Sequence, residues 1–192
     1  MRRNKLYSKF YSRSLPWIAS TTILLTLSSC DFVNEILQEY SLSPGQSSQP
    51  EPLPSQSPST ATMETQVIEQ INQIRLQKGL SELRFNEKLT VVARRYSKEM
   101  AEKNFFSHNS PEGDTVVERV RAEGVYYIMV GENLFKGTNL PQPVSIAVNG
   151  WMNSPGHRAN ILRPEYRETG VGVWRIGNTY YMTQLFLRSM TL

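Results

Sequence analysis

The sequence predicts an α+β domain in which helices cover a small β-sheet. Two observations support this prediction. Apolar residues recur at intervals of three and four in several segments between residues 63 and 153, and two β-rich segments around a glycine-led turn close the chain. Helices that precede and separate a few strands are typical of layered α+β domains. At 192 residues the chain has room for one such domain and for additional sequence before it.

Four helices are expected, and two of them carry a clear end signal. Gly79 suits the position just past the end of the first helix, and Asn86 can cap the first turn of the second. The second helix has the clearest apolar face, which indicates packing against the core. The expected helices are residues 63–79, 86–100, 115–124 and 144–153, with a break in the sequence Asn153-Ser154-Pro155-Gly156.

Two places in the chain are rich in β-forming residues. Residues 125–130 predict one strand. Residues 170–187 predict two strands that flank Gly177 and Asn178, a pair suited to a tight hairpin turn. The chain is therefore expected to end in a β-hairpin.

The first 29 residues have the order of an export signal. They contain five basic and no acidic residues, followed by an uncharged stretch with several leucines that ends in small residues. The apolar part is much shorter than the roughly 20 apolar residues of a membrane-spanning helix. We therefore expect residues 1–29 to be a removable signal peptide.

Cys30 is the only cysteine, so the chain can form no internal disulfide. It ends the sequence Leu27-Ser28-Ser29-Cys30, which resembles the lipobox at which bacterial lipoproteins are cleaved and acylated. An incidental cysteine after an ordinary signal is the alternative. The resemblance implies an exported lipoprotein that is anchored in a bacterial membrane through lipidated Cys30 and faces the periplasm or the exterior.

Residues 30–62 are expected to link this anchor to the folded domain. Between residues 41 and 62 the sequence is dominated by Ser, Pro and Gln and offers almost nothing apolar to bury. Such composition is typical of disordered, partly extended tethers. The folded domain is therefore expected to cover residues 63–192.

The charge balance excludes nucleic acid as a partner. The net charge of the chain is +4, but five of its 21 Lys and Arg residues lie in the signal. The remaining 16 are nearly balanced by 17 Asp and Glu, which leaves −1. A nearly neutral chain without a basic stripe lacks the surface that binds phosphate backbones. We expect a monomer.

The chain has two histidines, and both stand beside Ser, Pro and Gly residues instead of on an apolar helical face. His108 follows an aromatic pair, and His157 follows the break after the fourth helix. The sequence Gly131-Glu132-Asn133-Leu134 lies between them. Spacing alone leaves open whether the two histidines share a functional site.

Several segments together resemble the CAP family of cysteine-rich secretory, antigen 5 and pathogenesis-related proteins, in its bacterial, SCP-like extracellular form. The resemblance covers most of residues 65–192, and the segment from Trp151 to Leu162 is its most specific part. It implies a three-layer α-β-α sandwich with a large cleft. The segments that carry the resemblance are Phe106-Ser107-His108, Gly131-Glu132-Asn133-Leu134, residues 150–162 and Gly170-Val171-Gly172-Val173.

The resemblance also implies a site. In many family members the cleft holds two His and two Glu residues, which in some structures bind zinc or another divalent cation. Position by position, His108, Glu132 and His157 correspond to three of them, and three protein ligands leave an open coordination position on zinc. Ser154 stands where eukaryotic relatives have the second Glu. This departure weakens the expectation of a metal and of any mechanism that needs two carboxylates.

Another carboxylate could replace the missing one. Glu118 lies ten residues beyond His108, but Thr115 and Glu118 have the spacing of a helix capping box, and capping is the favoured interpretation. Glu112 and Glu168 are less constrained candidates.

Neighbouring residues of the same segments have expected roles as well. Arg158 could pair with Glu132 and shape the site. Trp151 is expected in the core. Asn133 and Asn160 are expected to bond loop backbone, and the strand that begins at Gly170 to pack closely beneath the cleft.

We favour a binding module, whose cleft captures a peptide, a glycan or a lipid. The alternative is a metal-assisted hydrolase of peptide or cell-envelope substrates, with the two histidines as ligands and Glu132 as ligand or general base. The sequence has no Gly-x-Ser-x-Gly or His-Glu-x-x-His segment that would favour an enzyme. A third hypothesis is that the protein is a structural spacer, in which the histidines only pack.

Overall fold

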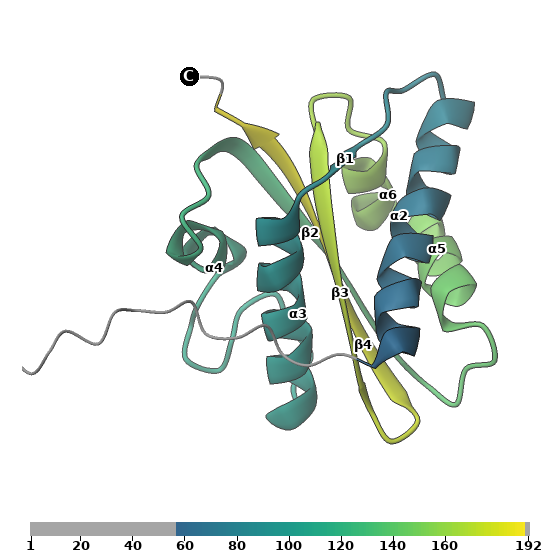
Figure 1. Ribbon diagram of the computed structural model, residues 1–192, viewed down its shortest axis with the longest axis vertical. Helices are drawn as coiled ribbons and strands as arrows, with labels where there is room; N and C mark the ends of the chain where they lie inside the picture. Colours follow the sequence, from purple (N-terminus) through teal and green to yellow (C-terminus); the bar gives the residue numbers. More distant parts are fainter. Residues whose placement is uncertain (1–56, 191–192) are drawn as a thin grey trace, which may run out of the picture. The chain divides into compact units, whose positions relative to one another are not determined.

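The computed structural model describes residues 57–190 (Figure 1). The predicted signal peptide, the predicted lipid anchor at Cys30 and most of the predicted tether lie outside these residues. None of the described helices is long and apolar enough to cross a membrane. The described elements are the helices α2 (Pro58–Gln77), α3 (Glu87–Glu102), α4 (Val116–Ala122), α5 (Pro143–Asn153) and α6 (Pro155–Ile161), and the strands β1 (Arg84–Phe85), β2 (Tyr127–Thr138), β3 (Glu168–Ile176) and β4 (Thr179–Ser189).

The four strands form one mixed sheet in the order β1-β3-β4-β2. Strands β3 and β4 form the predicted C-terminal hairpin, in which Gly177 takes the positive φ of 57° that favours glycine. Strand β2 pairs antiparallel with β4 over its length, whereas β1 pairs in parallel with only the first two residues of β3. The sheet therefore has two open edges, β2 on one side and most of β3 on the other.

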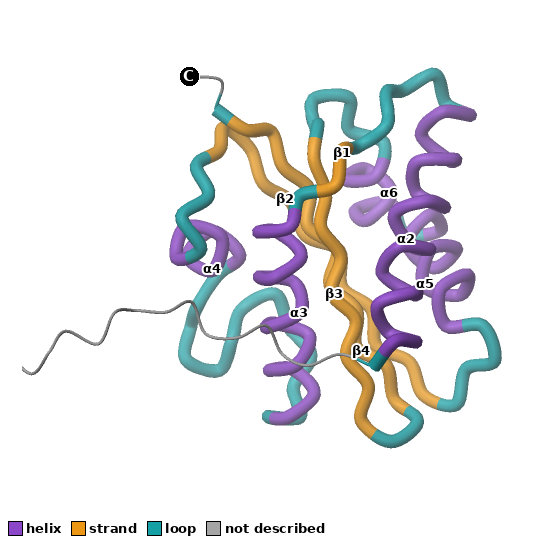
Figure 2. The backbone as a smooth tube through the Cα atoms, in the orientation of Figure 1, coloured by secondary structure: helices purple, strands orange, loops and turns teal. Residues whose placement is uncertain are grey.

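Helices cover both faces of this sheet (Figure 2). Because successive strand residues point to opposite faces, Val171 and Phe186 pack with α2, α5 and α6, whereas Leu185 and Leu187 pack with α3 and α4. The α+β architecture and the three layers implied by the family resemblance are thus confirmed.

Two glycines of β3 let α3 lie very close to the sheet. A Cβ atom on Gly172 would overlap the backbone of Ala93 and Arg94, and one on Gly170 would overlap the backbone at Leu89 and Thr90. The close packing expected of β3 is therefore confirmed, but the element packed against β3 is helix α3 and not the cleft.

An ion pair closes the open edge of β3. The guanidinium of Arg94 on α3 contacts the carboxylate of Glu64 on α2 at 2.7 Å, and Glu64 also accepts a hydrogen bond of 2.9 Å from the backbone N–H of Val173. Glu64 is 4% exposed. The pair therefore joins two helices to the strand between them (Figure 1).

The helix ends follow the sequence signals with one difference at the front. Asn86 caps α3, Thr115 and Glu118 form the predicted capping box of α4, and Gly79 follows α2 with a φ of 72°. Helix α2, however, begins at Pro58, inside the predicted tether. The Ser57 side chain accepts a bond from the Thr60 N–H, and a proline in the first turn is already preset for a helix.

Three further differences concern short or interrupted elements. The two-residue strand β1 was not predicted, and β2 continues past residue 130 to Thr138. The break at Ser154 is only one residue long, because Pro155 starts helix α6, which carries His157. The second histidine is therefore on a helix.

Candidate functional site

His108 lies in the loop between α3 and α4 and is held by a buried carboxylate. Its Nδ1 is 2.7 Å from Oε1 of Glu132 on β2. The His108 side chain is 60% exposed, whereas that of Glu132 is 3% exposed. The solvent-exposed imidazole is therefore hydrogen-bonded to a carboxylate that is shielded from solvent.

The other oxygen of Glu132 contacts Arg119 of α4. The guanidinium donates to Oε2 at 2.7 Å, and its central carbon lies 3.3 Å from the centre of the Tyr96 ring. Arg158, the partner expected from the sequence, is exposed and makes no ion pair within residues 57–190. That expectation was wrong because α4 and not α6 faces this side of β2.

The loop that carries His108 is fixed from below. The Tyr96 hydroxyl donates to the carbonyl of Ser107 at 2.6 Å, and Arg119 donates to the carbonyls of His108 and Asp114 at 3.2 and 2.9 Å. These bonds fix the backbone of the loop that carries His108 before any ligand is bound.

The second histidine belongs to the other side of the same strand. The side-chain amide of Asn133 donates to the carbonyl of His157 at 3.2 Å, and that of Asn160 donates to the carbonyl of Glu132 at 3.1 Å. The two asparagines bond backbone as predicted, but the acceptors lie on helix α6 and strand β2 and not in a loop. Because Glu132 and Asn133 point to opposite faces of edge strand β2, the site straddles that edge.

Trp151 completes this arrangement from α5. It is 2% exposed, as predicted for a core residue, and its indole N–H donates to the carbonyl of Leu134 at 2.9 Å. Two carbonyls of β2 are therefore satisfied by side chains of α5 and α6.

The two imidazoles have opposite electrostatic environments. The hydrogen bond to Glu132 raises the pKa of His108. Burial, followed by the charge of nearby His108, lowers the pKa of His157. A neutral His108 donates its Nδ1 proton to Glu132 and leaves Nε2 as a hydrogen-bond acceptor or proton acceptor. Burial also raises the pKa of Tyr96 to about 12, so its hydroxyl stays protonated.

Among the described residues, no second carboxylate takes the place that Ser154 leaves in the family pattern. Ser154 joins α5 to α6 and makes no side-chain cap bond. The Glu118 carboxylate accepts from the backbone N–H of Thr115 at 2.7 Å, which confirms capping over a place in the cleft.

The two remaining candidates are engaged away from the site. Glu112 pairs with Lys103 at 2.7 Å, and Glu168 pairs with Arg84 at the opposite side of the sheet.

The geometry of His108, Glu132 and His157 does not fit a divalent cation. Both oxygens of Glu132 already have partners, and one partner is a fixed guanidinium. Within residues 57–190, no three His, Cys, Asp or Glu side chains are grouped as a metal site would require. The zinc set implied by the family resemblance is therefore not supported by this geometry.

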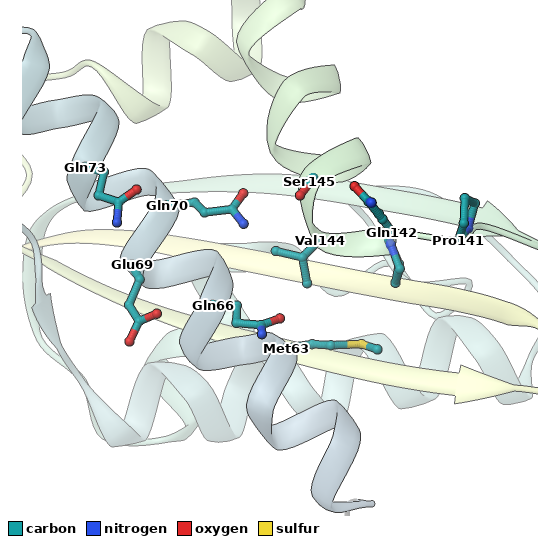
Figure 3. Close-up of a pocket in the computed structure, with 10 residues that line it drawn as sticks. Met63, Gln66, Glu69, Gln70, Gln73, Pro141, Gln142, Val144 and Ser145 are labelled. Carbon is teal, nitrogen blue, oxygen red and sulfur yellow. The ribbon is translucent and has the colours of Figure 1, made fainter.

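Two hollows lie in the described part of the chain near these elements. One, of about 220 Å³, lies between α3 and α4 and is lined partly by Tyr96 and Arg119. The other, of about 470 Å³, lies between α2 and the start of α5 (Figure 3) and is lined largely by amides such as Gln70 and Gln142. None of His108, Glu132 and His157 lines either hollow.

Comparisons with known proteins agree with the fold and the motifs. A model of the family described as CAP, cysteine-rich secretory protein family, matches residues 68–186. The chain is 38% identical over 129 residues to the uncharacterized protein YkwD of Bacillus subtilis (strain 168), a match that covers 67% of this chain and 48% of YkwD. It is 35% identical over 128 residues to the uncharacterized membrane protein YlbC of the same strain, which covers 66% of this chain and 35% of YlbC.

A solved structure gives the same result. An extracellular protein with an SCP domain from Bacillus anthracis (strain Ames) is 30% identical and superposes with a TM-score of 0.62, covering 71% of this chain and 45% of that protein. The chain thus matches half or less of the length of each of these relatives. With a family model that spans most of its folded part and the expected order of elements, the chain belongs to the CAP, or cysteine-rich secretory protein, family.

Proposed function

We propose that this protein is an exported, membrane-anchored CAP-domain protein whose cleft at His108, Glu132 and His157 binds a ligand such as a peptide, a glycan or a lipid. One observation supports this most strongly. The exposed imidazole of His108 is held at 2.7 Å by a carboxylate that is itself almost completely buried.

Burying a carboxylate is costly unless it is paired and hydrogen-bonded. Here the chain supplies Arg119 for that purpose and fixes the loop of His108 with the same guanidinium. An arrangement that serves stability alone does not need an exposed imidazole at its end. The cost and the exposure together support recognition of something outside the domain.

The site is polar, which favours hydrogen-bonding ligands. His108 offers Nε2, and the imidazole of His157 has no hydrogen-bond partner among the described residues. Two imidazoles can each donate or accept, as the amide and hydroxyl groups of peptides and glycans require. Among the three ligand classes we therefore place peptides and glycans ahead of lipids.

The location outside the cytoplasm rests on the N-terminal sequence and on relatives. The Bacillus anthracis relative is described as extracellular and YlbC as a membrane protein. We propose that lipidated Cys30 holds the chain at a bacterial membrane, as a monomer that binds no nucleic acid. Replacing Cys30 with Ser should move the protein from the membrane to the soluble fraction, and persistence at the membrane would contradict the anchor.

The ligand proposal can be tested by NMR, because a chain with two histidines gives two sets of imidazole signals. The full chain, purified without a histidine tag, is titrated with soluble muropeptides, which offer a peptide and a glycan, and separately with phosphatidylglycerol vesicles. We expect a saturable shift of both imidazoles with muropeptides. The shift should disappear in Glu132→Gln and persist in Arg175→Ala, a change at the exposed hairpin. The absence of a saturable shift with every probe would contradict a ligand site at these histidines.

A hydrolase is the second candidate, and one feature favours it. With Nδ1 held by Glu132, Nε2 of His108 is free to accept a proton, as a general base must. The metal that this alternative invokes has no support in the geometry. Cleavage of the muropeptides during the same titration, lost in His108→Ala, would establish the enzyme.

A further inference from the structure

Both oxygens of the Glu132 carboxylate are already engaged by side chains. Its Oε1 is bonded by the His108 ring and its Oε2 by Arg119, each at 2.7 Å. A carboxylate binds a metal through oxygen lone pairs that face the ion. Here an imidazole and a guanidinium each occupy one such direction, so a cation would have to share both oxygens with them.

Arg119 is built into this position. It donates to the carbonyls of His108 and Asp114 as well as to Glu132, and its central carbon lies 3.3 Å from the centre of the Tyr96 ring. Only 11% of its side chain is exposed. The capping box of α4, immediately ahead of it, fixes the start of the helix that carries it.

The guanidinium also has the charge of a cation. Arginine is a cationic side chain, and a buried charge is screened little by solvent. A divalent ion beside Glu132 would therefore meet a fixed like charge, whereas Arg119 already neutralises the carboxylate and holds the loop of His108.

We propose that Arg119 takes the place of a divalent cation in this cleft, so that the site works without metal and gains affinity for one only when the guanidinium is removed. The proposal concerns the cleft of the proposed ligand site. It does not depend on that ligand, because a titration with zinc alone measures it.

The test is calorimetric titration of the full chain, without a histidine tag, with zinc chloride. Arg119→Met removes the charge and keeps an unbranched stem over Tyr96, and Arg158→Met is the matched control at an exposed arginine. We expect no saturable binding up to millimolar zinc for the unmodified chain, Arg158→Met and Arg119→Lys. Arg119→Met should bind at least tenfold more tightly than the unmodified chain, and adding His108→Ala should abolish that gain.

Two results would overturn the proposal. One is saturable zinc binding by the unmodified chain that shifts the NMR signals of His108. The other is a folded Arg119→Met variant, verified by near-ultraviolet circular dichroism, that binds zinc no better than the unmodified chain. If Arg119→Met does not fold, the unmodified chain and Arg119→Lys still decide, because zinc binding at His108 by either contradicts the proposal.

Discussion

Each of the two edges of the sheet carries a buried ion pair between a glutamate and an arginine, but the two pairs have different roles. At the β3 edge Glu64 contacts Arg94, and at the β2 edge Glu132 contacts Arg119, each at 2.7 Å. Both glutamate side chains are buried, at 5% and 3% exposure. Burial and pairing therefore do not distinguish a structural site from a functional one.

The difference lies in the further partner of each carboxylate. Glu64 accepts from the backbone of Val173 and so closes a strand edge that the two-residue β1 leaves open. At the β2 edge the carbonyls of Glu132 and Leu134 are bonded by Asn160 and Trp151, so the carboxylate of Glu132 is not needed for closure. It supports an exposed imidazole instead.

The largest effect should come from breaking the pair at β3. Glu64→Ala leaves Arg94, whose side chain is 18% exposed, without its carboxylate and removes an acceptor from Val173. Removing one partner of a buried pair typically costs about 3 to 5 kcal/mol. We expect the free energy of unfolding in urea to fall by about 4 kcal/mol.

Two other variants sharpen this comparison. Glu69→Ala, an exposed position on the same helix, should change stability by about 0.5 kcal/mol or less. Glu132→Ala should cost less than Glu64→Ala, because Arg119 keeps two carbonyl acceptors, those of His108 and Asp114. A Glu64→Ala variant as stable as Glu69→Ala would show that the β3 edge does not depend on the pair.

An intermediate effect is expected from adding one methyl group at each edge. In Gly172→Ala the new Cβ meets the backbone of α3, which cannot move alone, and overpacking of this kind costs about 3 kcal/mol. In Gly131→Ala it meets the far ends of the Tyr166 and Asn160 side chains, so we expect about 1 kcal/mol.

Thermal or urea unfolding measures both changes. Gly150→Ala is the control, because nothing lies within 4 Å of a Cβ there and alanine favours a helix. Equal losses for Gly172→Ala and Gly131→Ala would mean that the β2 edge is packed as rigidly as the β3 edge.

Much of the fold could be predicted because its signals are local. Asn86 and the pair Thr115 and Glu118 stand directly at the helix starts they cap, and Gly177 marks the turn it forms. The apolar face of α3 is visible in its spacing alone. The burial of Trp151 could be predicted because it lies on the apolar face of its helix.

The site was predicted only in part, because its bonds join distant elements. The family resemblance brought His108 and Glu132 together, and their bond spans 24 residues. The resemblance gave no reason to expect Arg119 at the site, because in the sequence it is an ordinary charged residue on a short helix. The only local hint was its place one turn after the cap, on the helix that follows the His108 loop. The role of Glu64 could not be predicted from the sequence either, since its partners lie 30 and 109 residues away.

The smallest effects should appear in the titration of the two imidazoles at the β2 edge. The bond to Glu132 raises the pKa of His108 above 6.5, and burial lowers the pKa of His157 below it. Imidazole NMR signals followed against pH should therefore give two midpoints on opposite sides of 6.5. Glu132→Gln should lower the His108 midpoint. A His108 midpoint below that of His157 would show that Glu132 does not hold the imidazole in solution.

These shifts also fix the sign of the pH dependence of stability. A raised pKa in the folded state gives His108 a stabilising contribution that is complete below pH 6.5 and is lost as pH rises through its folded pKa. His157 acts oppositely, because the unfolded chain takes up its proton first, so stability is lost as pH falls from 6.5 through the folded pKa. His108→Ala should flatten the alkaline side of a plot of unfolding free energy against pH, and His157→Ala the acidic side. The same change on both sides from either variant would mean that the two imidazoles titrate as one unit, a stronger coupling than the secondary contribution of the His108 charge to the lowered pKa of His157.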